Sequence, residues 1–310
     1  MTIRTYQPGD EVAQVGIYNE AAADQPKFKP ATLDEVRRRL ARDFDPATRF
    51  YAVEAGRPVA YATLQANGRV SLPWCRKGHE RWAEPLFERV LEALRARNVP
   101  RVFAAYRADW AAARDFFLAH GFTQTREMLN YFLDLVEMPT PAARVGTTVT
   151  QLEHDDLAEL HALGAGVFRA GPAELERELW HNPYFAPDSL LGLRGKPGGK
   201  LMAAGVLVVN PAYANPKLLD AMMPCFRLGT FGTEGLTAKR VNGLFSFVVA
   251  EPHEANRHGV DLLAHAAYQL LETPVETLAA QVASDVPHLV RFYQQYFRSQ
   301  GRFPLYERTL

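Results

Sequence analysis

Apolar and polar positions along the chain follow helical and strand periods, and they predict the same order of elements twice. In the first part, strand-like runs are IRTY, RFYAVEA, PVAYATLQ, GRVSL, RVFAAY and MLNYFLDL, with a hairpin turn at Gly56 and Arg57 between the second and third. Helical spacing predicts helices over 10–23, 32–43 and 79–97, and in AAARDFFLAHGF up to Gly121. Thr32 and Glu35 have the spacing of a capping box at the start of the second helix.

The second part repeats this order. Its strand-like runs are TVTQL, SLLGLR, LMAAGVLVV, GLFSFVVA and TLAAQVA, and its helical segments are 153–168, 172–180, 256–271 and 285–299. Each part therefore reads as an α/β domain with a mixed sheet, in the order β-α-α-β-β-β-α-β-α-β.

Composition places a domain boundary between these parts. The segment DLVEMPTPAARVGTT has two prolines and no sustained period, which is typical of a linker. We expect an N-terminal domain at 1–140, a linker at 141–147 and a C-terminal domain at 148–310. Residues 210–241 have no equivalent in the first part, and they predict a packed insertion that determines specificity.

Charge and composition exclude several classes of protein. Lys plus Arg (35) equals Asp plus Glu (35), so nothing indicates nucleic-acid or membrane binding. Cys75 and Cys225 form no CxxC pair, and HExxxH at His253 has the wrong spacing for zinc, so we expect no metal. The start MTIRTYQPGDEV has no apolar signal region, and we expect a cytoplasmic protein.

Two stretches in each part resemble the GNAT acyltransferase family. In the second part, FVVAEPHEANRHGVDLL is similar to the turn where that family binds the pyrophosphate of coenzyme A at a helix N-terminus. The resemblance assigns cofactor binding to Val249, Ala250, Asn256, Arg257, His258, Gly259 and Val260. The first part has SLPWCRKGHERWAEPLF at this place, where Glu80 and Glu84 would repel a diphosphate.

The second stretch concerns catalysis. The family has a tyrosine that protonates the departing thiolate, and the resemblance places it at Tyr293 in the second part but at Phe117 in the first. Glu251, at the end of a strand, and Glu234, in the insertion, are rival candidates for the general base. Tyr293 could instead be a core aromatic, Gly259 a glycine for close helix packing, and Glu251 a solvated carboxylate.

The resemblance thus implies two tandem GNAT-like folds, in an arrangement similar to mycothiol synthase. It implies transfer of an acyl group from acetyl-CoA, or a related acyl-CoA, to a small-molecule amine by the C-terminal domain. A non-catalytic scaffold with decayed cofactor loops, which binds a ligand or a partner, is the alternative. The sequence predicts neither the acceptor nor the oligomeric state.

Overall fold

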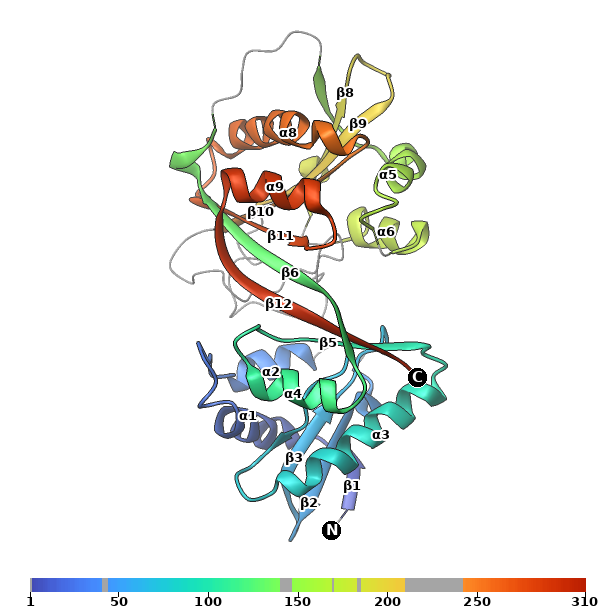
Figure 1. The fold of residues 1–310 in the computed structure, drawn as a ribbon, viewed down its shortest axis with the longest axis vertical. Coiled ribbons are helices and arrows are strands. Elements are labelled where there is room, and N and C mark those ends of the chain that lie inside the picture. Colours follow the sequence, from blue (N-terminus) through green and yellow to red (C-terminus); the bar gives the residue numbers. More distant parts are fainter. Residues whose placement is uncertain (1, 41–43, 140–146, 169, 183–184, 210–241) are drawn as a thin grey trace. The chain divides into compact units, whose positions relative to one another are not determined.

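A computed structural model describes residues 2–40, 44–139, 147–168, 170–182, 185–209 and 242–310 (Figure 1). Contacts divide the chain into two compact units. The N-terminal unit contains residues 1–127 and 303–310, and the C-terminal unit contains residues 128–302. None of the helices in these described ranges combines the length and the apolar character that a membrane crossing requires.

The N-terminal unit consists of a small antiparallel sheet with helices on both faces. Its elements are β1 (Thr2–Thr5), α1 (Asp10–Ala21), α2 (Leu33–Arg39), β2 (Arg49–Glu54), β3 (Arg57–Thr63), β4 (Trp74–Cys75), α3 (Ala83–Ala96), β5 (Arg101–Ala105) and α4 (Ala111–Ala119). The strands β1 to β4 follow one another in sheet order, and β5 pairs antiparallel with the end of β12 (Arg298–Thr309).

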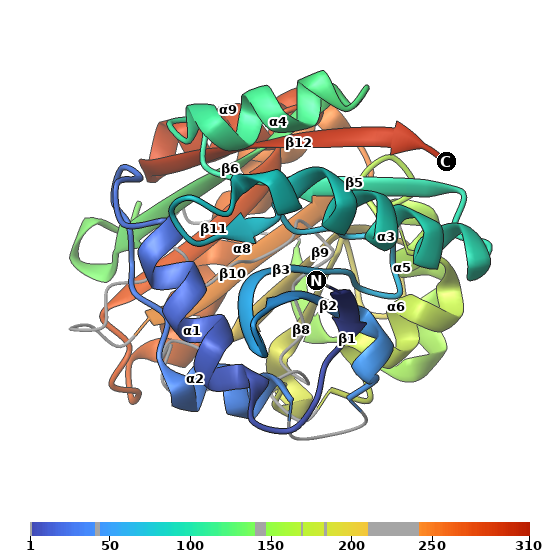
Figure 2. The ribbon, with the colours of Figure 1, turned by 90° about the horizontal axis from the view of Figure 1, so that it is seen from below.

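Alternate residues of the central strands face two separate cores. Phe50 and Ala60 lie in the core beneath α3 and α4, while Tyr51 and Tyr61 pack in an aromatic core with α1. Figure 2 shows α1 and α3 on opposite sides of these strands. The period of two in RFYAVEA and PVAYATLQ thus corresponds to a sheet that is buried on both faces.

Local signals set several boundaries in this unit. The backbone N–H of Thr32 donates to Glu35 Oε2 at 3.0 Å, and the N–H of Glu35 donates to Thr32 Oγ1 at 3.3 Å, which confirms the capping box. The hairpin turn lies one residue earlier than expected. Ala55 and Gly56 take it, with φ of 47° and 76°, and Arg57 already belongs to β3.

The strand expected in GRVSL is wrong. Leu64 and Val70, and Arg69 and Phe103, form isolated bridges only, and the strand that pairs with β3 is β4, at Trp74 and Cys75. The residues of GRVSL alternate as they would in a strand, but their backbone forms only one bridge to Leu64 and one to Phe103.

The C-terminal unit has a larger mixed sheet. Its elements are the later part of β6 (Thr123–Asp134), β7 (Thr148–Gln151), α5 (Leu157–Leu163), α6 (Pro172–Leu179), β8 (Leu190–Arg194), β9 (Leu201–Val208), β10 (Asn242–Val249), α8 (Ala255–Leu270), β11 (Thr277–Ala283), α9 (Pro287–Tyr296) and the start of β12. The strand order is β7-β8-β9-β10-β11-β6-β12. The helix expected at 285–299 ends earlier, at Tyr296, because β12 begins at Arg298.

The strand β10 is buried on both faces, which explains its nearly continuous apolar sequence. Phe245, Phe247 and Val249 belong to the core beneath α8 and α9, whereas Leu244 and Val248 belong to the core beneath α5 and α6. The strand therefore positions residues against both layers of helices.

Each unit is completed by a strand from the other half of the sequence. Residues 303–310, at the end of the second half, pair with β5 in the N-terminal unit, and β6, the last strand of the first half, pairs with β11 in the C-terminal unit. This division differs from the domain limits 1–140 and 148–310 that composition suggested. Most of the expected linker at 141–147, and the insertion at 210–241, lie outside the described residues.

Candidate active site

The strands β10 and β11 run parallel but pair over only a short stretch. In the described residues their ladder joins Asn242 to Thr277, Gly243 to Leu278 and Leu244 to Ala279. Beyond Leu244, β10 continues to Val249 along β9, and β11 continues along β6. We call residues 245–249 of β10, on the side facing away from β9, the open edge.

Backbone groups of the open edge alternate in direction. The N–H of Ala250 donates to the carbonyl oxygen of Met202 at 2.9 Å, so Ala250 faces β9. In an antiparallel ladder, alternate residues direct their N–H groups to opposite sides, and Phe247 and Val249 therefore direct theirs to the open edge. A strand edge of this kind can pair with a peptide-like chain, such as the amides of a pantetheine arm.

Tyr293 of α9 lies beside this edge. Its ring is fully buried, stacks on Tyr131 at 5.7 Å between centroids, and contacts Phe247 at 5.9 Å. Its hydroxyl is near the Ser246 side chain and the backbone N–H of Phe247, but it makes no hydrogen bond of normal geometry with any described residue.

The surroundings determine the protonation of this hydroxyl. Burial raises the pKa of Tyr293 well above its ordinary value, and Ser246 and the Phe247 N–H offset only part of the rise. The hydroxyl is therefore protonated at neutral pH. The ring of Tyr293 therefore belongs to the core, and the part of its hydroxyl as a general acid stays a prediction.

Gly259 lies inside α8 rather than at its start. The helix begins at Ala255, after a 3₁₀ turn at Pro252–Glu254. An added Cβ at Gly259 would lie 2.6 Å from the Phe292 ring and 2.7 Å from the Phe247 ring. This position supports the packing interpretation, in which the missing side chain lets α8 approach the sheet. A part for Gly259 in cofactor binding stays a prediction.

Polar groups at the start of α8 are bound to one another. Arg257 Nη1 lies 3.3 Å and His258 Nε2 lies 3.8 Å from Glu254 Oε2, and Asn256 Nδ2 donates to Gln295 Oε1 at 2.9 Å. Asn256 and Arg257 are exposed, whereas His258 is buried. In the sequence, Glu254 stands out only as part of the HExxxH pattern that was rejected for zinc, and its i,i+3 and i,i+4 spacing to Arg257 and His258 is the signal that predicts these contacts.

The remaining predicted residues lie at different depths. Glu251 is exposed at the end of β10, where it precedes the 3₁₀ turn. Val249 and Val260 are buried, and Ala250 is exposed. Glu234 lies outside the described residues, so its part as a general base stays a prediction.

The corresponding loop of the N-terminal unit is filled by its own carboxylates. Glu20 Oε1 accepts the backbone N–H of Lys77 at 3.0 Å, and Glu80 Oε1 accepts that of Gly78 at 3.0 Å. The Lys77 N–H lowers the pKa of Glu20 and so favours its charged form. Backbone donors that could hold a phosphate are thus already bound, which agrees with the expectation that this copy is unsuited to coenzyme A.

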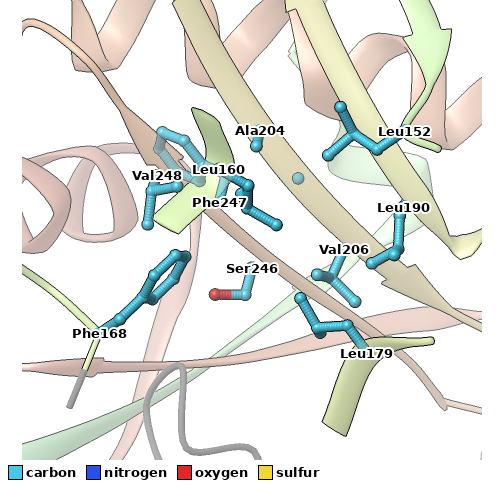
Figure 3. Close-up of a pocket in the computed structure, with 11 residues that line it drawn as sticks. Leu152, Leu160, Phe168, Leu179, Leu190, Ala204, Val206, Ser246, Phe247 and Val248 are labelled. Carbon is cyan, nitrogen blue, oxygen red and sulfur yellow. The ribbon is translucent and has the colours of Figure 1, made fainter. Parts of the chain in front are cut away.

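A small pocket lies on the face of the sheet beneath α5 and α6 (Figure 3). Its walls are apolar apart from Ser246, and the residues that line it are Leu152, Leu160, Phe168, Leu179, Leu190, Ala204, Gly205, Val206, Ser246, Phe247 and Val248. The pocket thus reaches the open edge through Ser246 and Phe247.

Comparison with known proteins identifies the fold. No family model and no curated protein matches the sequence. A GCN5-related N-acetyltransferase from Sphaerobacter thermophilus aligns over 99% of this chain and 95% of its own, with a TM-score of 0.64 and 15% identity. A tandem GNAT protein from the clavulanic acid biosynthesis pathway aligns over 99% and 98%, with a TM-score of 0.60 and 16% identity.

A third solved structure of similar fold has an acyl-CoA bound. The N-myristoyltransferase of Saccharomyces cerevisiae with bound myristoyl-CoA aligns over 99% of this chain and 77% of its own, at a TM-score of 0.50 and 10% identity. Identities this low show the fold alone. The chain thus has the tandem GNAT-like fold, and the α/β class that its sequence predicted is confirmed.

Proposed function

We propose that the protein is an acyl-CoA-dependent N-acyltransferase that transfers an acyl group to a small-molecule amine in its C-terminal unit. The observation that carries this proposal is the unpartnered hydroxyl of Tyr293 beside the open edge of β10. A buried hydroxyl without a partner destabilises the folded protein by about 1–3 kcal/mol, so its retention supports a use in binding or chemistry. The solved structures of similar fold include acetyltransferases and one bound to an acyl-CoA.

The described residues fit an acyl-CoA. The N–H group of Val249 pairs with an amide of the pantetheine arm along the open edge. Arg257 and Asn256, exposed at the start of α8, bind the diphosphate together with the helix N-terminus. In the structure, Glu254 neutralises part of the positive charge of Arg257. The Arg257 side chain therefore has to turn from Glu254 to the diphosphate when the ligand binds.

The chemistry then uses groups on both sides of the open edge. The Phe247 N–H stabilises the negative charge on the thioester oxygen as the amine nitrogen attacks the carbonyl carbon. Glu251, or Glu234, accepts the proton that the amine loses, directly or through water. The carbon–sulfur bond breaks, and Tyr293 donates its proton to the departing thiolate.

Calorimetry tests the binding step. Acetyl-CoA should bind at one site per chain, and Arg257→Glu should weaken it about tenfold or more, since charge reversal at a phosphate contact removes a charge-assisted hydrogen bond. Arg81→Glu, the matched change in the N-terminal unit, should leave affinity unchanged. Two equivalent sites would mean that both units bind acetyl-CoA, and a single site lost only with Arg81→Glu would place binding in the N-terminal unit; either outcome contradicts the proposed assignment.

The second candidate is a non-catalytic scaffold, and the carboxylates of Glu251 and Glu254 near the start of α8 favour it, because they oppose a diphosphate. If the wild-type protein binds neither acetyl-CoA nor an acyl-CoA with a longer chain, the scaffold is the better description.

A further inference from the structure

Two polar side chains occupy matching positions after β10 and β11 separate. The last residues to pair are Leu244 and Ala279, and Ser246 and Gln281 each lie two positions further on. Since side chains alternate along a strand, both point to the same face of the sheet as Leu244 and Ala279, in the layer of α5 and α6. Ser246 and Gln281 are thus opposite each other where the ladder would have continued.

Gln281 is buried and only half satisfied. Its exposed fraction is 4%, and its Nε2 donates to Oδ1 of Asn130 on β6, the strand paired with β11. Its Oε1 is buried and has no hydrogen-bond partner among the described residues. Burial of an acceptor without a partner is unfavourable, and a ligand that donates a hydrogen bond to Gln281 Oε1 would remove this cost.

The second unsatisfied group is the hydroxyl of Tyr293, which lies on α9 beside β10. The Tyr293 hydroxyl is near Ser246, the residue opposite Gln281, and it too has no partner in the described ranges. One unsatisfied acceptor and one unsatisfied donor thus lie on elements that flank the open edge. An acyl transfer to an amine needs an acceptor for the amine N–H and a donor for the leaving sulfur.

We infer that Gln281 positions the acceptor amine, with its Oε1 accepting a hydrogen bond from the amine N–H while Asn130 holds its amide. The inference rests on the proposed function and adds a residue and a substrate class to it. The hydroxyl of Ser246 and the amides of Asn130 and Gln281 are uncharged, and their buried setting disfavours an ammonium ion. The acceptor is therefore an amine of low basicity, which arrives uncharged, rather than a polyamine or a lysine side chain.

Steady-state kinetics with hydroxylamine, a small amine that is largely uncharged at neutral pH, test the inference. Release of free thiol is followed at saturating acetyl-CoA, and acetyl-CoA affinity is measured by calorimetry on the same samples. Gln281→Met should raise KM for hydroxylamine about tenfold or more, with acetyl-CoA affinity within about twofold of wild type. Gln281→Glu keeps an oxygen acceptor, and its KM should lie closer to wild type.

The matched control is Gln14→Met in the N-terminal unit. Gln14 is also a buried glutamine, but its Oε1 accepts from Arg49 at 3.0 Å and from Tyr51 at 2.8 Å. Gln14→Met should leave KM for hydroxylamine unchanged and lower the melting temperature. An unchanged KM in an active Gln281→Met protein, or a preference of the wild type for ethylamine over hydroxylamine, would overturn the inference while the proposed function stands.

Stability gives a readout that needs no turnover. Gln281→Met removes the unsatisfied Oε1 together with one hydrogen bond to Asn130, so its melting temperature should fall less than that of Gln14→Met, which removes an acceptor of two hydrogen bonds. A fall as large as that of Gln14→Met would show that the pair is structural. A wild-type protein that binds no acyl-CoA would overturn the proposed function and this inference with it.

Discussion

Single residues in this protein combine packing with chemistry. The ring of Tyr293 fills the core between Tyr131, Phe247 and Phe292, yet its hydroxyl is unused within the described structure. The helical period of 285–299 identified the buried position, and the family resemblance suggested the role. Gln281 and Ser246 carry no charge and belong to neither stretch of the family resemblance, although a polar residue within an apolar strand such as TLAAQVA or GLFSFVVA is itself a signal.

Removal of the Tyr293 hydroxyl should separate activity from stability. Tyr293→Phe deletes an unpartnered buried group, so the free energy of unfolding should stay equal or rise. Turnover should fall by about 10²- to 10⁴-fold, with acyl-CoA affinity nearly unchanged. Tyr131→Phe, on the ring stacked against it, is the matched control and should retain turnover. Equal turnover in both variants would make Tyr293 a core aromatic alone.

The absence of a side chain at Gly259 is a second feature of a single residue that can be tested. Gly259→Ala should destabilise the protein by about 1–3 kcal/mol, because the new methyl group overlaps two aromatic rings. At Gly166 an added Cβ meets nothing within 4 Å, and Gly166→Ala should therefore be nearly neutral. Chemical denaturation measures both changes. A neutral Gly259→Ala protein would mean that α8 can move away from the sheet at little cost.

At the scale of elements, the sequence predicted best where the signal is local. The capping box at Thr32 and the helices α1, α3 and α8 follow from periods and end groups within a few residues. Strand pairing is not local, and there the predictions were weaker. The run GRVSL has a strand-like alternation but forms single bridges, because β3 pairs instead with the two residues of β4.

The parallel ladder of β10 and β11 shows what a sequence cannot supply. The apolar runs GLFSFVVA and TLAAQVA predict two buried strands, but not that their pairing ends at Leu244 and Ala279. The structure gives the position at which these strands separate. This position makes Ser246 and Gln281 neighbours of the open edge.

At the scale of the molecule, each half of the sequence lends its last strand to the other unit. The order of elements predicted two copies of one fold, and the copies are present, but the partners of their last strands could not be read from periodicity. Sheet contacts between residues far apart in sequence leave no local pattern.

A truncation tests this exchange. Deletion of residues 303–310 removes the strand that pairs with β5 and takes Leu305 and Tyr306 out of the buried interior. The N-terminal unit should lose protection from hydrogen exchange in β5, whereas β10 and β11 should keep theirs. Replacement of the exposed Arg302 by Ala, just before the deleted segment, is the control. Unchanged protection of β5 after the deletion would contradict the observed pairing.

The same pairing has a consequence during synthesis on the ribosome. Leu305 pairs with Ala105, about 200 positions earlier in the chain. The first half therefore leaves the ribosome long before its pairing residues in β12 are translated. Until residues 303–310 leave the exit tunnel, the edge of β5 that pairs with β12 is unoccupied and is available to other chains. The half that is made first is therefore completed only by residues of the second half, and loss of residues 303–310 would damage the N-terminal unit rather than the unit that precedes them in the sequence.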